Sequence, residues 1–208
     1  EILGDIRGKS LCLTLTSVIL DRIGNYTIAL EQCEQALNLC RATGWRYTEA
    51  RFLATSANIY LNVGNFHASR TLHEQVIRIC TESGDREGIA TSLDTLGLIL
   101  YFSDHLLDAK RFYEEALTIH RAMNNHRGQG YVLTHLGFTL AELGEYRSAR
   151  EALEQALLIR SKSTDTNLRL DTLAGFILLA LKRHEPEQAL PYVNEILKKF
   201  ETSGADGS

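Results

Sequence analysis

The sequence repeats with a period of forty residues, and this period restricts the fold more than any other feature. The segments "GNYTIAL", "GNFHASR" and "GEYRSAR" begin at Gly24, Gly64 and Gly144. The second segment begins 40 residues after the first, and the third begins 80 residues after the second. Two weaker repeats start in the same register, "DHLLDAK" at Asp104 and "HEPEQAL" at His184. A fixed period without insertions indicates a chain built from one supersecondary unit, repeated five times.

Each repeat has the pattern of a helical hairpin. Apolar residues recur at helical spacing before the turn, as at Leu133, Leu136 and Leu140, and again after it, as at Leu153 and Leu157. A single hairpin cannot bury its apolar face, so the hairpins must stack on one another. We expect one domain over residues 1–208, with repeats at about 4–43, 44–83, 84–123, 124–163 and 164–203 and a tail at 204–208.

Glycine, asparagine and proline mark the expected helix ends. Gly24, Gly64 and Gly144 lie at the turn within a repeat, where the backbone needs a positive φ. Three residues suit the ends of the second helices: Gly44, Gly84 and Asn124. Three more suit the N-caps of the first helices that follow: Asp85, Asn125 and Asp165. Pro186 is expected to begin a helix, because its fixed φ suits a first turn.

Small residues indicate where the two helices of a hairpin touch. One position of the first helix holds Ser17, Ala57, Gly97 and Gly137. A position of the second helix, twelve residues later, holds Ala29, Ser69, Ala109, Ala149 and Ala189. Small side chains at both positions let the two helix axes approach closely, so we expect no space there for a large side chain.

These features resemble the tetratricopeptide repeat. That family has a small residue on the first helix, an aromatic residue after the turn and two alanines on the second helix. Repeat four supplies Gly137, Tyr146, Ala149 and Ala156, and repeat one supplies Ser17, Tyr26, Ala29 and Ala36. The third and fifth repeats depart from the pattern at Leu106, Pro186 and Ile196. The resemblance implies an all-α fold, a right-handed α-solenoid of five stacked helical hairpins.

The repeats are longer than the family's usual length of about 34 residues, and "GDREGIA" at residues 84–90 separates two of them. This longer form resembles the sensor arrays of bacterial STAND-type signal-transduction ATPases and transcriptional regulators, and residues 173–197 look like a late repeat of such an array. The resemblance implies a part of a larger bacterial regulator, whose NTPase and DNA-binding domains lie elsewhere. The first residue is Glu1 rather than Met, so we expect an excised piece of a longer protein.

Residues 4–10, "GDIRGKS", end like a phosphate-binding loop, which has the pattern G-x-x-x-x-G-K-[ST]. Only three residues separate Gly4 from Gly8, one fewer than that loop needs, and there is no room for a strand before Gly4. The phrase recurs as "GDREGIA", with an Ile-Ala pair in place of Lys9 and Ser10. We therefore interpret Gly8, Lys9 and Ser10 as part of the repeat rather than as a nucleotide site.

The composition argues against several classes of function. Lys and Arg number 22 against 26 Asp and Glu, a net charge of −4, which gives no basic footprint for nucleic acid or an anionic membrane. The seven histidines lack the i, i+4 spacing of a metal site. The four cysteines form no C-x-x-C pair, which indicates reduced, mostly buried thiols and a cytoplasmic protein. We expect no enzyme activity, no metal and no cofactor.

In the resembling family the first helices line a concave groove, and the resemblance assigns the candidate binding residues. Repeats two and three contribute Arg51, Asn58, Asn62, Asp94, Leu98, Tyr101 and Phe102. Repeats four and five contribute Tyr131, Thr134, Phe138, Glu142, Asp171 and Lys182. The family's carboxylate clamp is incomplete, because only Asn58 of its polar set is present. Its companion positions hold Ala54, Thr95, Tyr131 and His135.

Two functions stay open. The first is a non-catalytic protein–protein interaction module that binds a peptide segment or a partner domain, which could belong to the same full-length chain. The second is an effector-sensing domain of a signal-transduction ATPase or transcriptional regulator, with a small molecule in the groove. Neither function involves direct contact with nucleic acid or with a membrane. Polar pairs such as Glu154-Gln155 are expected on the solvated outer side of the second helices.

Overall fold

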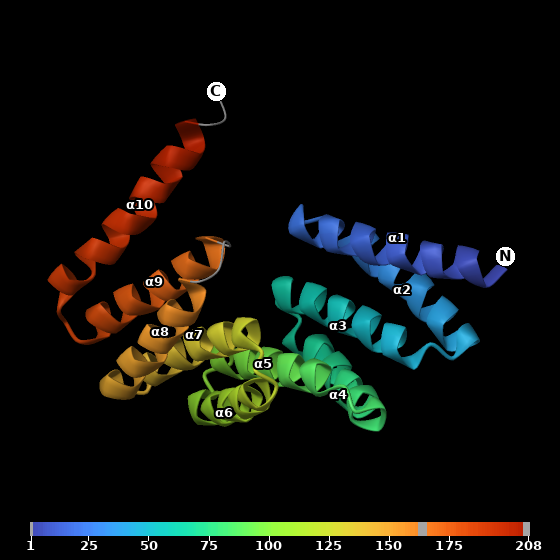
Figure 1. The fold of residues 1–208 in the computed structure, drawn as a ribbon, viewed down its shortest axis with the longest axis horizontal. Helices are drawn as coiled ribbons and strands as arrows, with labels where there is room; N and C mark the ends of the chain where they lie inside the picture. Colours follow the sequence, from blue (N-terminus) through green and yellow to red (C-terminus); the bar gives the residue numbers. More distant parts are fainter. Residues whose placement is uncertain (1, 162–165, 206–208) are drawn as a thin grey trace. The chain divides into compact units, whose positions relative to one another are not determined.

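The computed structural model describes residues 2–161 and 166–205, and these residues form helices and no strand (Figure 1). The elements are α1 (Ile2–Arg22), α2 (Tyr26–Thr43), α3 (Arg46–Asn62), α4 (Phe66–Ser83), α5 (Arg86–Phe102), α6 (Leu106–Ala122), α7 (His126–Glu142), α8 (Tyr146–Arg160), α9 (Thr166–Lys182), the short 3-10 helix η1 (Pro186–Gln188) and α10 (Leu190–Ala205). The predicted all-α series of helix pairs is confirmed, and the repeat of forty residues is visible in the helix starts.

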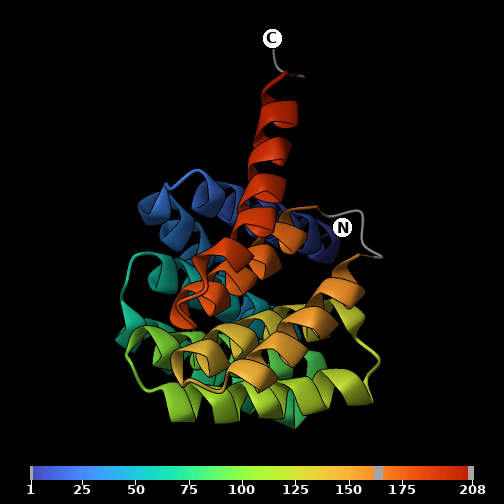
Figure 2. The ribbon, with the colours of Figure 1, turned by 90° about the vertical axis from the view of Figure 1, so that its left-hand side faces the viewer.

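The chain divides into two compact units, Glu1–Ile99 and Leu100–Ser208. In the first unit α2 packs against α1 and α3, and α3 packs against α4. In the second unit α7 packs against α6, α8 and α9, and α9 also packs against α10 (Figure 2). The second helices α2 and α8 therefore each contact both the first helix of their own hairpin and the first helix of the next hairpin. The single domain over residues 1–208 stays a prediction.

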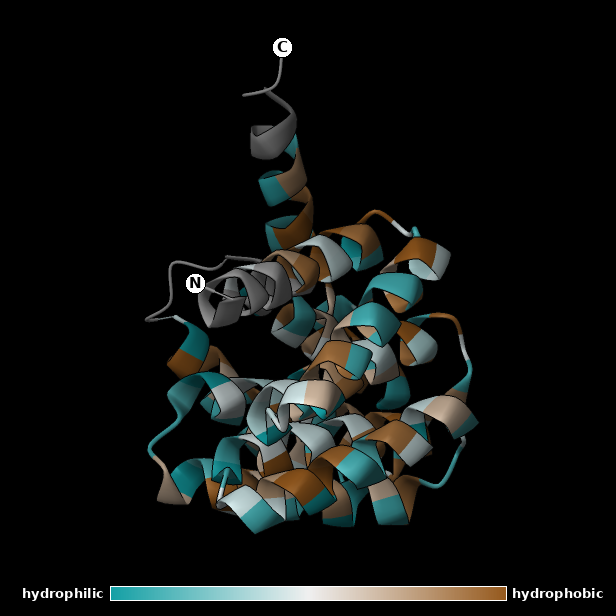
Figure 3. Ribbon diagram, turned by 90° about the vertical axis from the view of Figure 1, so that its right-hand side faces the viewer, coloured by the Kyte–Doolittle hydropathy of each residue, from teal (hydrophilic) through white to brown (hydrophobic). Residues whose placement is uncertain are grey.

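The core of the first unit shows how the second helices are buried. Cys33, Ala36 and Cys40 of α2 join Phe52 and Leu53 of α3 in one cluster of buried side chains. Hydrophobic and hydrophilic residues alternate along the helices, as expected of amphipathic helices with one buried face (Figure 3). Three of the four free cysteines are buried and Cys12 is exposed, which confirms that the thiols serve mostly as core residues.

The turn predictions are confirmed. Gly24, Gly64 and Gly144 have φ values of 78°, 77° and 78°, in the region that glycine adopts without strain. Asp104 and His184 occupy the same turn position in the third and fifth repeats with positive φ values of 61° and 58°. The ends of the second helices at Gly44, Gly84 and Asn124 also have positive φ.

Two of the expected N-caps form in the structure. Asp85 Oδ1 accepts a hydrogen bond from the backbone N–H of Gly88 at 2.9 Å, and Asn125 Oδ1 accepts one from Gly128 at the same distance. Asp165 lies outside the described residues. Pro186 begins a helical turn as expected, but this turn is the short 3-10 helix η1. The α-helix α10 begins four residues later, at Leu190.

The predicted contact between small residues is confirmed where α7 meets α8. A Cβ atom added to Gly137 would lie 2.7 Å from Leu153 Cδ2 and 3.5 Å from the carbonyl oxygen of Ala149. Such a separation from Leu153 is closer than real Cβ atoms approach, so an alanine at residue 137 would require the Leu153 side chain or the helix to shift. Ala149 itself has no exposed surface.

Residues Gly8, Lys9 and Ser10 lie within helix α1 rather than in a loop. A helical backbone directs its N–H groups into its own hydrogen bonds, so it cannot wrap a phosphate in the middle of a helix. The related glycines have a packing role. A Cβ at Gly88 would lie 2.5 Å from Cys80 Sγ, and one at Gly128 would lie 2.3 Å from the ring of His120. The repeated glycine therefore makes space for the last buried side chain of the preceding helix.

Lys9→Ala is expected to leave the melting temperature and any binding by this chain nearly unchanged, because Lys9 lies in a helix and not in a nucleotide-binding loop. Circular dichroism melts and calorimetric titration with ATP check this expectation. Tight ATP binding by the wild-type chain that disappears in Lys9→Ala would contradict it.

Candidate recognition surfaces

The candidate residues of the first unit lie mostly at the surface. Arg51 and Asn58 of α3 are exposed, whereas Asp94 and Leu98 of α5 are half-buried. Asn62, at the end of α3, is exposed and donates from Nδ2 to Asp21 Oδ1 at 2.9 Å. This hydrogen bond ties the ends of α1 and α3 together. Of this group, Arg51 lines a cavity of the first unit.

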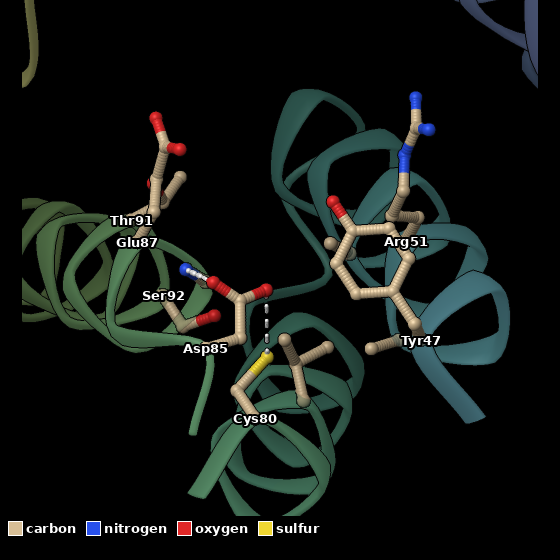
Figure 4. A pocket seen from close by; sticks show the side chains of 11 residues that line it. Tyr47, Arg51, Cys80, Asp85, Glu87, Thr91 and Ser92 are labelled. Carbon is tan, nitrogen blue, oxygen red and sulfur yellow. Dashed lines mark hydrogen bonds between the residues drawn. The ribbon is translucent and has the colours of Figure 1, made fainter. Parts of the chain in front are cut away.

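A cavity of about 230 Å³ opens at the surface of the first unit, between α3, α4 and α5. Figure 4 shows Tyr47 and Arg51 of α3 on one side and Glu87 and Thr91 of α5 on the other. Cys80, from the end of α4, and Asp85, which precedes α5, lie between these two sides. The cavity thus combines an aromatic ring, a guanidinium and carboxylates.

Cys80 and Asp85 line this cavity and are held in place by hydrogen bonds. The Cys80 thiol donates to Asp85 Oδ2 at 3.8 Å, while the other carboxylate oxygen caps α5. Burial, together with the nearby charge of Asp85, raises the pKa of Cys80 to about 11. Because nucleophilic attack requires the thiolate, Cys80 is unsuited to covalent chemistry at neutral pH. Its role here is structural.

The second unit places aromatic and charged candidates side by side. The rings of Tyr101 and Phe102 meet edge to face with their centroids 5.5 Å apart. Lys182 of α9 forms an ion pair with Glu142 of α7. Burial raises the pKa of Tyr101, and the nearby charge of Glu142 adds to this effect. Since Phe102 is 59% exposed, this four-residue surface offers an accessible ring next to a cation and an anion.

Tyr131 and Phe138 lie seven residues apart on α7, so they share one side of that helix, and both are half-buried. The guanidinium carbon of Arg160 lies 5.2 Å from the centre of the Tyr131 ring, within the range of a cation–π contact. On α9, Asp171 is exposed and Lys182 is half-buried. We use the name aromatic surface for six candidates of the second unit, of which Tyr101, Glu142 and Lys182 interact with one another and Tyr131 contacts Arg160. The six are Tyr101, Phe102, Tyr131, Phe138, Glu142 and Lys182.

Thr134 corrects the sequence-based list. Only 1% of its surface is exposed, and its hydroxyl donates to the carbonyl of Gly130 at 3.0 Å. It also lies 3.1 Å from the hydroxyl of Thr172 on α9, which in turn accepts from Arg160 Nη1 at 2.8 Å. Thr134 therefore belongs to a buried polar network between α7, α8 and α9, and it is not available to a binding partner.

Comparison with known families agrees with this arrangement of helices. Two models described as the tetratricopeptide repeat match the sequence, one over residues 48–122 and one over residues 131–163. Together they cover more than half of the chain. The chain belongs to the tetratricopeptide repeat family. The resemblance inferred from the small residues, the aromatic residues and the alanines is thereby confirmed. A comparison with curated protein sequences gave no match.

Solved structures support the tetratricopeptide fold. BtubC (BKLC) from P. vanneervenii superposes with a TM-score of 0.74 and 17% identity, over 94% of this chain and 80% of that one. Aspartyl phosphate phosphatase F from Bacillus subtilis gives 0.81 and 12%, over 95% of this chain and 51% of that one.

A third similar structure comes from Pyrococcus horikoshii. It is a Signal Transduction ATPase with Numerous Domains (STAND) protein with a tetratricopeptide repeat sensor, and it gives a TM-score of 0.75 and 17% identity. The match covers 99% of this chain and 33% of that one. The chain thus spans about half of the Bacillus phosphatase and a third of the STAND protein. At these identities the likeness concerns the fold alone.

Sequence reasoning missed the cavity of the tetratricopeptide array. Tyr47 and Glu87 lie forty residues apart, as do Arg51 and Thr91, so each pair occupies equivalent positions on α3 and α5. The forty-residue register could have found these residues, because Arg51 was already a candidate and the others lie on the same side of the first helices. No helix among the described residues combines the length and the apolar character of a membrane span.

Proposed function

We propose that this chain is a non-catalytic recognition module of a larger cytoplasmic bacterial regulator, and that it binds a peptide segment or a partner domain on the aromatic surface. The observation that carries this proposal is the exposed Phe102 ring beside Tyr101 and the Glu142–Lys182 ion pair. Aromatic residues supply much of the contact area and binding energy in protein interfaces. A partner domain on the same full-length chain would satisfy the same chemistry.

The charges of the aromatic surface suit a polypeptide ligand. Glu142 and Lys182 keep side-chain exposures of 25% and 40%, so water still reaches both groups. Partly exposed ion pairs contribute little to stability, about 0–1 kcal/mol. A polar group of the partner can therefore replace either member at small cost, while its apolar side chains cover Phe102. This combination of an apolar centre with a polar rim is typical of protein interfaces.

Replacing Tyr131 and Phe138 together with alanine is expected to weaken binding more than tenfold, or about 1.4 kcal/mol, since both rings lie on one side of α7. Peptides selected on the wild-type chain from a displayed random library serve as probes. Their affinities for the double variant are measured by fluorescence anisotropy. The helical circular dichroism should change little, because alanine has the highest helix propensity of all residues.

The comparison variant is Glu154→Ala, which changes an exposed residue of α8. It should leave peptide affinity unchanged. Loss of binding in Glu154→Ala but not in the double variant would place recognition on the second helices and remove the aromatic surface from the proposal.

A small effector bound in the cavity of the first unit is the second candidate function. The cavity of about 230 Å³ is lined by Arg51, Tyr47 and Glu87, which could hold a small polar molecule. Typical ligand pockets measure about 300–1,000 Å³, so this one is small and favours the peptide proposal. The two functions respond to different variants. A small effector would lose affinity in Arg51→Ala and would tolerate the changes at Tyr131 and Phe138.

A further inference from the structure

The cavity of the first unit contains a negative charge that lacks a cationic partner among the described residues. Asp85 is half-buried, and its Oδ1 atom accepts from the backbone N–H of Gly88 at 2.9 Å. Its Oδ2 atom accepts from the Cys80 thiol at 3.8 Å, and a thiol is a weak donor. No lysine or arginine of the described residues forms an ion pair with this carboxylate. Because burying a charge is costly unless it is paired, the cavity favours a ligand that brings a positive charge to Asp85.

A positive charge lies on another side of the same cavity. Arg51 of α3 is exposed, and its guanidinium forms no ion pair within residues 2–161 and 166–205. Figure 4 shows Arg51 and Asp85 lining the cavity from different elements, with no interaction between them. One open space is therefore bordered by two opposite charges that do not neutralise each other directly.

Hydroxyl groups and a small apolar wall complete the lining. The Tyr47 hydroxyl points from α3 toward the opposite side, and the hydroxyl of the buried Ser92 points inward from α5 (Figure 4). Thr91 adds a third hydroxyl, whereas Ala54 and Val76 supply apolar surface. A hydroxyl both donates and accepts hydrogen bonds, so these groups suit either end of a polar ligand. The apolar wall suits a short aliphatic part.

Two small side chains open this space within the array. His120 and Tyr131 lie forty residues after Cys80 and Thr91, so they occupy the equivalent positions of the next junction between hairpins. There the His120 ring fills the space next to Gly128, because a Cβ on that glycine would lie 2.3 Å from the ring. At the junction of α3, α4 and α5 the shorter thiol and the shorter hydroxyl leave the space unfilled. The cavity therefore reflects these particular residues and is not a general property of the repeat.

From these charges we infer that the cavity binds a free α-amino acid. Its ammonium group lies next to the Asp85 carboxylate, and its own carboxylate accepts from the Arg51 guanidinium. Arginine suits this role because its N–H donors match the two oxygens of a carboxylate. The Tyr47 hydroxyl lies between the two charged ends. The inference rests on the second candidate function, whose ligand it specifies, and it does not depend on the aromatic surface.

The size and the charges both favour an amino acid over other polar molecules. A water molecule occupies about 30 Å³ of liquid volume, so a cavity of about 230 Å³ corresponds to about eight waters. A small amino acid has a similar number of non-hydrogen atoms. Among the described residues no group of three or more His, Cys, Asp or Glu side chains could hold a metal ion. A simple anion would meet the Asp85 charge, and a simple cation would meet that of Arg51.

Isothermal titration calorimetry of the purified chain with each of the twenty amino acids tests the inference. At least one with a short side chain should bind with a dissociation constant of about 1 mM or lower. Its methyl ester lacks the carboxylate and its N-acetyl derivative lacks the ammonium group, so each should bind more than tenfold more weakly. Binding by the esters or the N-acetyl derivatives alone overturns the amino acid but retains a small effector. No binding in any of the three series overturns both.

Two variants that remove charge test the site. Asp85→Asn should keep the helix cap, because Asn125 caps α7 in the same way with its Oδ1 atom. Arg51→Gln removes the positive charge from an exposed side chain. Each should weaken amino acid binding more than tenfold and leave the circular dichroism spectrum unchanged. The matched control is Arg70→Gln, since the Arg70 side chain is 61% exposed on α4 and pairs with Glu74. Affinity that is the same in both cavity variants and the control contradicts the proposed contacts.

A variant that fills the cavity separates a ligand inside it from one bound elsewhere. Cys80→His introduces the side chain that His120 has in the next repeat, and Gly88 is equivalent to the Gly128 that accommodates it. The variant should therefore fold, as circular dichroism can verify, but it should lose amino acid binding. Unchanged affinity in a folded Cys80→His chain would place the amino acid outside the cavity and overturn the inference.

Discussion

Ala149→Leu is expected to lower the free energy of unfolding by about 1–3 kcal/mol, the usual cost of overpacking a filled core. Ala149 is fully buried, and its carbonyl lies next to Gly137 of α7. The additional leucine atoms have no space there, so α7 and α8 must separate. For a chain of this length the melting temperature should fall by roughly 2–12 °C. Thermal unfolding followed by circular dichroism measures the change.

Arg147→Leu is the appropriate comparison for this variant. The neighbouring Arg150 is less suitable, because it is half-buried and donates to Gln188 Oε1 at 3.3 Å. The Arg147 side chain is 94% exposed on the same helix, so its replacement should change the melting temperature little. Equal melting temperatures for Ala149→Leu and Arg147→Leu would mean that Ala149 is not at the contact between the helices.

Acidification is expected to destabilise the chain through His73. This residue of α4 is 1% exposed, and both of its ring nitrogens lack a hydrogen-bond partner among the described residues. Burial lowers the pKa of His73 to about 4 from the ordinary value of 6.5. The folded chain therefore keeps His73 neutral at pH values where the unfolded chain binds a proton.

The sign and the pH range follow from these two pKa values. Above pH 6.5 His73 is neutral in both states and adds no pH dependence. Between pH 6.5 and about 4 the unfolded state holds the additional proton, so stability decreases as the pH falls. The loss approaches about 3 kcal/mol near the lower pKa, since one pKa unit corresponds to about 1.4 kcal/mol. Urea unfolding at a series of pH values measures this slope.

His73→Leu should flatten this part of the profile, and leucine suits the site because Leu153 occupies the equivalent position in the fourth repeat. The control is His67→Leu, which removes an exposed histidine from the same helix. Its profile should run parallel to that of the wild-type chain. A His73→Leu variant that loses stability with acid as steeply as the wild type would show that another group is responsible.

The sequence was sufficient for features that depend on local backbone geometry. The turn glycines and the caps at Asp85 and Asn125 follow from φ preferences and from the need to satisfy the first N–H groups of a helix. The close contact at Gly137 follows from the forty-residue register. These rules operate within one hairpin or between two successive ones, so a single sequence contains the information they require.

The depth of individual side chains could not be predicted in the same way. Asp94 and Thr134 occupy equivalent positions, yet Asp94 is half-buried while Thr134 is enclosed. Thr134 is enclosed because α9 packs against α7 and supplies Thr172 as a hydrogen-bond partner. The cavity likewise depends on the spacing of α3, α4 and α5 near Asp85. Such details depend on the distances between helices, which the register alone does not fix.

The pairing of Cys80 with Gly88, and of His120 with Gly128, also determines whether the hairpins can be exchanged as modules. A hairpin that ends in His120 would meet Thr48 if it were recombined to precede α3, because the second repeat has a side chain where Gly128 has none. The imidazole would then have no space. Successful domain grafting must therefore cut the chain within a hairpin and transfer each junction intact, together with the glycine that accommodates it.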